Sequence, residues 1–258
     1  MKFLKTIFII SIGILLAQCD GNTEQANLVF EDSCTGDPWE GWFLDGLKAQ
    51  VSTSEEGMLF EAGPDHGSDS SHAVLWTKKT FEGDIRIAFD YTRTDTTTRC
   101  VNILYFHASG KGDSEFRTDI YEWRDQRRVP SMRKYFLNMS AYHISFAAFD
   151  ANKYSGDNDY IRLRQYDPSL NKLGGTEILP DAFKTGLFKP FVTYHMEVLL
   201  SQGTINMSVV NQADANDKLE MKWDVSEKDP LKSGRIGLRH MYTRKAIYKN
   251  FTVWQLAE

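Results

Sequence analysis

The chain has 258 residues, a formal net charge of −5 and 13% aromatic residues. This length suits one large domain, and the acidic balance argues against nucleic-acid binding, because phosphate binding needs concentrated lysine and arginine. A smaller anionic ligand stays open, since a local basic cleft can lie on an acidic protein.

The N-terminus has the pattern of an export signal. Two lysines precede an apolar run, residues 7–17, that is too short to span a bilayer comfortably. The run ends in Leu16-Ala17-Gln18-Cys19, which is similar to the lipobox of bacterial lipoproteins, although a small residue is usual where Gln18 stands. The alternative is an ordinary secretory signal with a chance cysteine.

This pattern sets the expected organisation of the chain. We expect residues 1–18 to be a lipoprotein signal peptide and Cys19 to be lipidated. Residues 19–27 then tether one domain, residues 28–258, to the outer membrane, on its periplasmic or its cell-surface side.

Short segments with β character follow the tether. They are rich in Ile, Val, Phe, Tyr and Thr, turns separate most of them, and long helical periodicity is missing. Ser201-Gln202-Gly203 predicts a hairpin turn. The pattern favours an all-β fold, a two-sheet antiparallel jelly-roll sandwich. The predicted strands are Ala73–Thr77, Asp84–Tyr91, Val101–Ala108, Ser140–Phe149, Tyr160–Tyr166, Tyr194–Leu200, Thr204–Val210, Leu219–Asp224, Gly234–Met241 and Tyr248–Leu256.

Alternation along four of these strands gathers Arg, His and Tyr on one face. If the four strands are neighbours, that face is a basic, aromatic-lined groove. Alternation predicts faces but not adjacency, and a solvated outer surface is the alternative. The residues placed on this face are Tyr105, His107, His143, Ser145, Tyr160, Arg162, Arg164, Tyr166, Arg235 and Arg239.

The C-terminal strands carry a resemblance to known proteins. Gly234-Arg235-Ile236-Gly237-Leu238-Arg239, followed by Tyr248-Lys249-Asn250-Phe251, resembles the last two strands of concanavalin A-like lectin/glucanase domains. Four further segments resemble a narrower group, the YesU-like family, formerly a domain of unknown function: His72-Ala73-Val74-Leu75-Trp76, Phe81-Glu82-Gly83-Asp84, Tyr105-Phe106-His107-Ala108-Ser109-Gly110 and Tyr142-His143-Ile144-Ser145-Phe146. The similarity runs from about Phe30 to Leu256.

The resemblance implies a concanavalin A-like jelly roll with a concave carbohydrate-binding face. It also implies a role in degrading polysaccharides that contain uronate and rhamnose, such as ulvan and rhamnogalacturonan. Glycosidases of this superfamily carry carboxylates at positions i, i+2 and i+4 of one strand. Between Glu115 and Asp119 stands Arg117, and no such run occurs in the sequence, which argues against a retaining hydrolase of that type.

The predicted polar face suits β-elimination from a uronic acid instead. Cationic groups can neutralise the carboxylate and stabilise an enolate-like intermediate, a histidine can remove the C5 proton, and a tyrosine can protonate the leaving oxygen. The leaving group is glycosidic in a lyase and a hydroxyl in a dehydratase, and the sequence does not choose between them. The candidate catalytic residues are His143, His107 and Tyr105, and the candidate substrate-binding residues are Arg162, Arg164, Arg239 and Tyr160.

Other functions and sites stay open. A non-catalytic sugar-binding lipoprotein would use the same groove, whereas a structural interaction domain would bind no sugar. We expect an anionic saccharide as partner and no cofactor, apart from a structural calcium ion for which Glu31 and Asp32 are plausible oxygen donors. Cys34 and Cys100 either form a disulfide or stay free.

Overall fold

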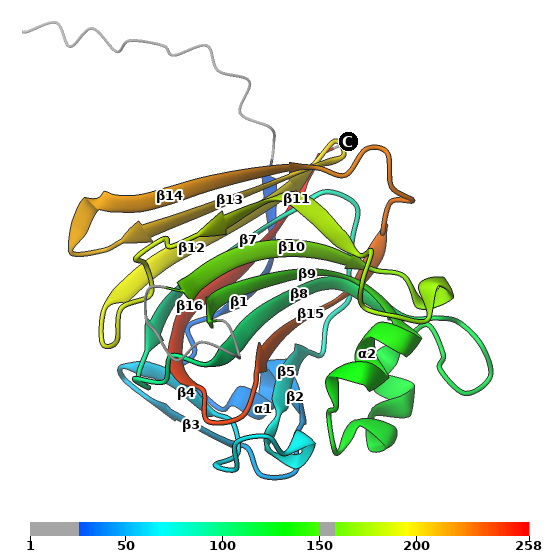
Figure 1. Ribbon diagram of the computed structural model, residues 1–258, viewed down its shortest axis with the longest axis horizontal. Helices are drawn as coiled ribbons and strands as arrows, with labels where there is room; N and C mark the ends of the chain where they lie inside the picture. The colour runs from blue at the N-terminus through cyan, green and yellow to red at the C-terminus, as the bar shows by residue number, and fades with distance from the viewer. Residues whose placement is uncertain (1–25, 150–157, 258) are drawn as a thin grey trace, which may run out of the picture.

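The computed structural model describes residues 26–149 and 158–257. Sixteen strands in these ranges form two antiparallel sheets, which confirms the predicted all-β sandwich (Figure 1). The predicted signal peptide and Cys19 lie outside the described residues. Within the described ranges, no helix has the length and apolar character needed to cross a membrane.

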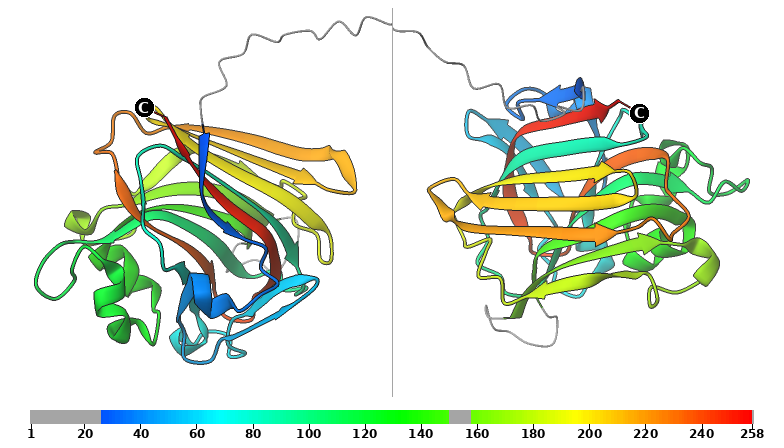
Figure 2. Two further views of the ribbon diagram at one scale, coloured as in Figure 1. Left: turned by 180° about the vertical axis from the view of Figure 1, so that it is seen from behind. Right: turned by 90° about the horizontal axis from the view of Figure 1, so that it is seen from above.

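Sheet A has the order β14-β13-β12-β7-β16-β4-β3, and β1 also pairs with β16. Its strands are β1 (Ala26–Asp32), β3 (Gln50–Ser54), β4 (Gly57–Glu61), β7 (Ile85–Arg93), β12 (Thr193–Ser201), β13 (Thr204–Asn211), β14 (Asp214–Asp224) and β16 (Lys245–Leu256). Figure 2 shows the first strand (blue) beside the last (red), so the two ends of the domain meet in one sheet.

Sheet B has the order β11-β10-β9-β8-β15-β5-β2, and β6 also pairs with β15. Its strands are β2 (Trp42–Asp45), β5 (Ala73–Thr77), β6 (Phe81–Glu82), β8 (Cys100–Gly110), β9 (Met139–Phe149), β10 (Asp159–Tyr166), β11 (Glu177–Phe183) and β15 (Ser233–His240). The short helices are α1 (Pro38–Gly41), α2 (Met132–Asn138), η1 (Asp69–Ser71), η2 (Ile120–Arg127) and η4 (Pro168–Leu170).

The predicted hairpin joins β12 to β13. Ser201 pairs with Thr204, and Gln202 and Gly203 between them both have positive φ, at 48° and 73°. Two positive φ values in a two-residue loop match the right-handed twist of the flanking strands. The hairpin prediction is therefore confirmed.

A large apolar core fills the space between the sheets. Alternate residues of each strand point into it, as the period of two requires. From sheet A it takes Phe89, Met196, Trp223 and Phe251, among others, and from sheet B it takes Leu104, Phe106, Ile144 and Leu238, among others.

The opposite face of sheet B, called here the concave face, carries a second buried cluster. Trp76, Tyr105 and Tyr166 of the sheet pack there with Trp123 of η2 and Tyr135 of α2. Residues 111–138, which contain these two helices, lie over part of that face (Figure 1). This stretch is called the cover segment below.

Candidate functional site

Strands β10, β9, β8 and β15 are consecutive neighbours in sheet B, so the condition set for the predicted groove is met. Two rows of Cα-paired residues cross the four strands on the concave face. The His143 row contains Arg164, His143, Tyr105 and Gly237. The Arg239 row contains Arg162, Ser145, Ile103 and Arg239. Adjacency therefore brings together side chains that lie up to 136 positions apart, from Ile103 to Arg239.

His143 lies at the centre of a buried polar cluster. Its Nδ1 is 2.7 Å from the hydroxyl of Tyr166, and its Nε2 is 2.8 Å from Oγ of Ser145. The Tyr166 hydroxyl is also 3.4 Å from that of Tyr105. His143, Tyr105 and Tyr166 are each only 1% exposed, so the cluster is shielded from bulk water.

Burial sets the protonation of this cluster. Desolvation lowers the pKa of His143 well below its usual range, and the nearby charges of Arg164, Arg239 and Arg162 lower it further. Desolvation raises the pKa of Tyr166 well above its usual range and also raises the pKa of Tyr105. At neutral pH the histidine is therefore an unprotonated base, and both phenols keep their protons.

Two of the three predicted arginines are paired with carboxylates of β11. Arg162 donates from Nε to Oδ2 of Asp181 over 2.7 Å, and Arg164 pairs with Glu177. Both arginines are partly exposed at the edge of the concave face. They therefore lie at its open side, and one carboxylate of β11 already compensates the charge of each.

Arg239 differs from the other buried arginines. Of the five in the described residues, four form ion pairs with an aspartate: Arg93 and Arg244 with Asp95, Arg127 with Asp45, and Arg235 with Asp119. Arg239 is 0% exposed and forms no ion pair within the described part of the chain. It donates from Nη2 to the carbonyl of Pro130 (2.7 Å) and to Nδ1 of His72 (2.9 Å).

The group around Arg239 is rich in unused donors. Its Nε and Nη1 have no hydrogen-bond partner among the described residues. Because a guanidinium can only donate, Nδ1 of His72 must accept, which places the proton of this histidine on Nε2. That nitrogen is also buried without a partner in the described ranges. Burial, followed by the charge of Arg239, lowers the pKa of His72 to about 3, so His72 is neutral at pH 7.

The cover segment is anchored by Asp45 of β2. This buried carboxylate accepts from Nε1 of Trp76 (2.8 Å), Nε of Arg127 (2.5 Å) and the hydroxyl of Tyr135 (2.8 Å). Sheet and cover are thereby joined on both sides of the turn that contains Pro130. Asp45 was not singled out from the sequence, because its partners lie 31, 82 and 90 positions away.

Gly237 explains one glycine of the C-terminal motif. An added Cβ would lie 2.4 Å from Cε3 of Trp76, so only glycine lets the indole cross β15. The indole then stacks on Tyr105, with ring centroids 5.4 Å apart and an interplanar angle of 18°. The glycine thus shapes the floor on which the polar cluster lies.

A protein-family comparison matches residues 28–253 with the model of a domain of unknown function, DUF1961. The chain belongs to this family. The uncharacterized protein YesU of Bacillus subtilis (strain 168) is 25% identical over 219 residues, which cover 83% of this chain and 89% of that protein. The predicted resemblance to the YesU-like family is confirmed.

Solved structures share the fold of this DUF1961 domain. A Bacillus subtilis protein of unknown function with a galectin-like fold has a TM-score of 0.65 at 19% identity, covering 90% of this chain and 97% of that one. The exoplasmic/lumenal domain of VIP36, in a Ca²⁺/Man-bound form, has a TM-score of 0.53 at 13% identity, covering 92% of each chain. At these identities the likeness establishes the fold.

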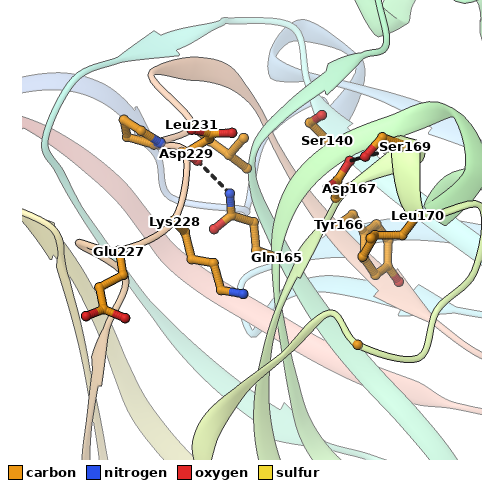
Figure 3. A pocket seen from close by; sticks show the side chains of 12 residues that line it. Ser140, Gln165, Tyr166, Asp167, Ser169, Leu170, Glu227, Lys228, Asp229 and Leu231 are labelled. Carbon is orange, nitrogen blue, oxygen red and sulfur yellow. Dashed lines mark hydrogen bonds between the residues drawn. The ribbon is translucent and has the colours of Figure 1, made fainter.

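A polar pocket of about 440 Å³ adjoins the buried polar cluster of His143 at Tyr166 (Figure 3). It lies between the end of β10 and the loop that joins β14 to β15. Nε2 of Gln165 donates to the carbonyl of Asp229 over 2.7 Å and so links β10 to this loop. Tyr166 forms part of the lining. The pocket is lined by Ser140, Gln165, Tyr166, Asp167, Ser169, Leu170, Gly175, Glu227, Lys228, Asp229, Pro230 and Leu231.

His107 is not part of this cluster, contrary to the prediction from alternation. The register of β8 shifts between Phe106 and Ser109, and His107 itself has a φ of 48°. This bulge turns the ring toward Tyr142, which belongs to the core between the sheets, and Nδ1 lies 2.7 Å from the carbonyl of Leu231. An extra residue in one strand reverses the expected face, and one sequence cannot reveal it.

The remaining candidates divide between the open edge and the interior of the DUF1961 domain. Tyr160 is half-buried beside Phe183 of β11, a residue that the strand prediction missed altogether. Arg239 was expected in an open groove but lies under the cover segment, because Pro130 closes over it. Exposure depends on what packs above a strand, and alternation does not report that.

Asp32, one of the two residues predicted to donate oxygen to calcium, takes part in hydrogen bonds near β1. Its carboxylate accepts from the backbone nitrogen of Cys34 (2.7 Å) and from Nε1 of Trp42 (2.6 Å), one hydrogen bond on each oxygen. No group of three or more His, Cys, Asp or Glu side chains suited to a metal occurs in residues 26–149 and 158–257. Cys34 and Cys100 are both free and buried.

Proposed function

We propose that the concave face of sheet B binds the carboxylate of a uronic-acid-containing oligosaccharide and that the His143 cluster catalyses β-elimination on it. The observation that carries this proposal is the buried charge of Arg239, which lies 4.7 Å from the centroid of the Tyr135 ring but has no carboxylate partner among the described residues. A charge held away from water is costly unless it is compensated, and removing a partner from such a charge typically costs about 3–5 kcal/mol. A carboxylate of the substrate supplies the missing partner.

The donors around Arg239 support an anion in particular. Nε and Nη1 of Arg239 and Nε2 of His72 are all unsatisfied donors in the described part of the chain, with no unsatisfied carboxylate beside them. A carboxylate oxygen accepts charge-assisted hydrogen bonds from donors of this kind. The carboxylate of a uronate thus supplies the hydrogen-bond acceptors that these donors lack.

In the proposed reaction, His143 removes the C5 proton, and the two electrons of that bond form the C4–C5 double bond. The bond between C4 and its oxygen substituent breaks, and Tyr166 or Tyr105 gives its proton to the departing oxygen. The proton on His143 then returns to the phenolate through the 2.7 Å contact with Tyr166. No oxidant, reductant or further reactant is needed.

Substrate binding would also adjust the base. Three arginines help to hold the pKa of His143 low in the free protein. A bound carboxylate offsets their charge and raises the pKa of His143 toward the working pH, where a general base is most effective. His143 therefore becomes a stronger base when the substrate is bound.

Access requires movement of the turn in the cover segment. Sδ of Met132 is 3.7 Å from the hydroxyl of Tyr105 and 3.6 Å from that of Tyr166, which are long contacts to a weak acceptor. Two anchors, Arg127 and Tyr135 on Asp45, lie on either side of this turn, and opening also breaks the bond from Arg239 to the carbonyl of Pro130. The turn can therefore open while its flanks stay attached.

The 1% exposure of His143 supports a second candidate function. A non-catalytic carbohydrate-binding lipoprotein would bind oligosaccharides over the partly exposed Arg162 and Arg164 and leave the buried cluster as structure. Export, lipidation of Cys19 and attachment to the outer membrane are part of both proposals. Acylation is tested by the mass of the N-terminal peptide in wild type and in Cys19→Ser.

The deciding experiment follows ultraviolet absorbance while the purified protein is mixed with uronate-rich oligosaccharides. A rising signal from an unsaturated uronate is expected, and product mass then separates loss of water from chain cleavage. His143→Ala should abolish the signal while binding survives. His195→Gln is the matched control, because His195 lies on β12 of the other sheet with a 47% exposed side chain. Binding by wild type without any signal would leave the non-catalytic function.

A further inference from the structure

Phe183 is an exposed aromatic ring beside the concave face. It is the last residue of β11 and is 63% exposed. It pairs with Tyr160 across β10 and β11, and the two ring centroids lie 6.4 Å apart at 45°. Tyr160 packs against the buried cluster of the concave face, so its cross-strand partner faces the same side.

The backbone holds Phe183 firmly in this exposed position. The nitrogen of Lys184, the next residue, donates to the carbonyl of Asp159 over 2.9 Å. The carboxylate of Asp159 in turn accepts from the nitrogen of Gly186 over 3.1 Å and from the hydroxyl of Thr185. The ring therefore stands on a fixed strand end, and little conformational freedom is lost when a ligand covers it.

The ring also lies at a useful distance from His143. Tyr160 and Arg164 are four residues apart on β10, and Phe183 is two strands away from the strand of His143. With the usual rise per residue and strand spacing, Phe183 and His143 are separated by roughly 16 Å. Arg162, paired with Asp181, lies on β10 between them. A short oligosaccharide spans this distance, whereas a single sugar does not.

We propose that Phe183 and Tyr160 form a stacking subsite that holds a sugar ring distant from the uronate at Arg239 and His143. The apolar face of a pyranose covers the exposed ring, and its hydroxyl groups reach the polar side chains along β10. This inference rests on the proposed function and adds the substrate class. The preferred ligand is a chain of several sugars. Its affinity increases with chain length until the chain reaches the stacking subsite.

The test measures the affinity of uronate oligosaccharides of increasing length, and of the free uronic acid, by titration calorimetry. Phe183→Ala should weaken binding of the longer chains about tenfold, the effect of losing one aromatic contact, and leave the uronic acid unchanged. Phe183→Tyr should keep wild-type affinity. Phe191→Ala is the matched control, because Phe191 is 69% exposed in the loop between β11 and β12.

Different failures have different meanings. If wild type binds long chains and Phe183→Ala binds them equally well, the subsite is refuted and the proposed function stands. If wild type binds no uronate saccharide of any length, the proposed function fails and the subsite with it. Sedimentation of both proteins tests whether a second copy of the chain covers Phe183 instead. A wild-type dimer that Phe183→Ala dissociates would assign the ring to that contact and refute the subsite.

Discussion

Replacing Arg239 by methionine separates the stability of the domain from its proposed binding. The side chain is 0% exposed, and its guanidinium has no carboxylate partner among the described residues, although it contacts Pro130 and His72. Methionine keeps much of the length and apolar volume and removes the charge. The comparison variant is Arg127→Met, which removes an arginine that is also buried but is paired with Asp45.

Opposing terms set the size of the effect. In Arg239→Met, the acceptors on Pro130 and His72 lose their donor, which costs about 1–3 kcal/mol each. Removal of a buried charge that has no carboxylate partner in the described ranges returns several kcal/mol, so the two terms roughly cancel and the free energy of unfolding stays within about 1 kcal/mol of wild type. Arg127→Met strands the Asp45 carboxylate instead and should cost about 3–5 kcal/mol.

Urea unfolding followed by tryptophan fluorescence measures both variants, and calorimetry measures uronate binding. A difference of at least about 2 kcal/mol between the variants corresponds to about 4–8 °C in Tm for a domain of this size. Loss of a buried charge contact should weaken uronate binding by about 2 kcal/mol or more, about 30-fold. Arg239→Met with unchanged uronate affinity, or as unstable as Arg127→Met, would refute the assigned role of this charge.

Two further predictions concern stability. Gly237→Ala should lower the free energy of unfolding by about 1–3 kcal/mol through overpacking, because its Cβ would lie 2.4 Å from Cε3 of Trp76. The near-ultraviolet circular dichroism spectrum should change with it. Gly174→Ala is the control, because the space around Gly174 is open, and its spectrum should match that of wild type. Burial lowers the pKa of both His72 and His240 to about 3. Their unfolded pKa is about 6.5, so their stabilisation is present above that pH and is lost as pH falls, by up to about 2.7 kcal/mol per pH unit for the pair. Urea midpoints at pH 7.5 and 5.5 measure this loss, and equal unfolding free energies would contradict it.

The predicted strands and faces came from local features that the structure retains. Short β-rich segments gave ten of the strands, and side-chain alternation correctly grouped Tyr105, His143, Arg164 and Arg239 on one face of sheet B. Alternation works because successive residues of any regular strand point to opposite sides, whatever the strand pairs with.

Several elements gave no such local signal. The short strands near the N-terminus mix polar and apolar residues, and β11 contains Pro180, which argues against a central strand. Its place at the edge of sheet B removes that objection. The bulge at His107 was also hidden, because one added residue reverses a face without changing the composition.

The sequence alone determined the all-β class, the polar side chains of one sheet face and the family resemblance, since each depends on the order of neighbouring residues. Only the tertiary structure decided that the four polar strands are adjacent, that Asp45 anchors a cover over them, and that Arg239 is buried without a carboxylate partner in the described ranges. These properties depend on contacts between distant segments. Burial and charge compensation are set by such contacts, and a linear pattern does not contain them.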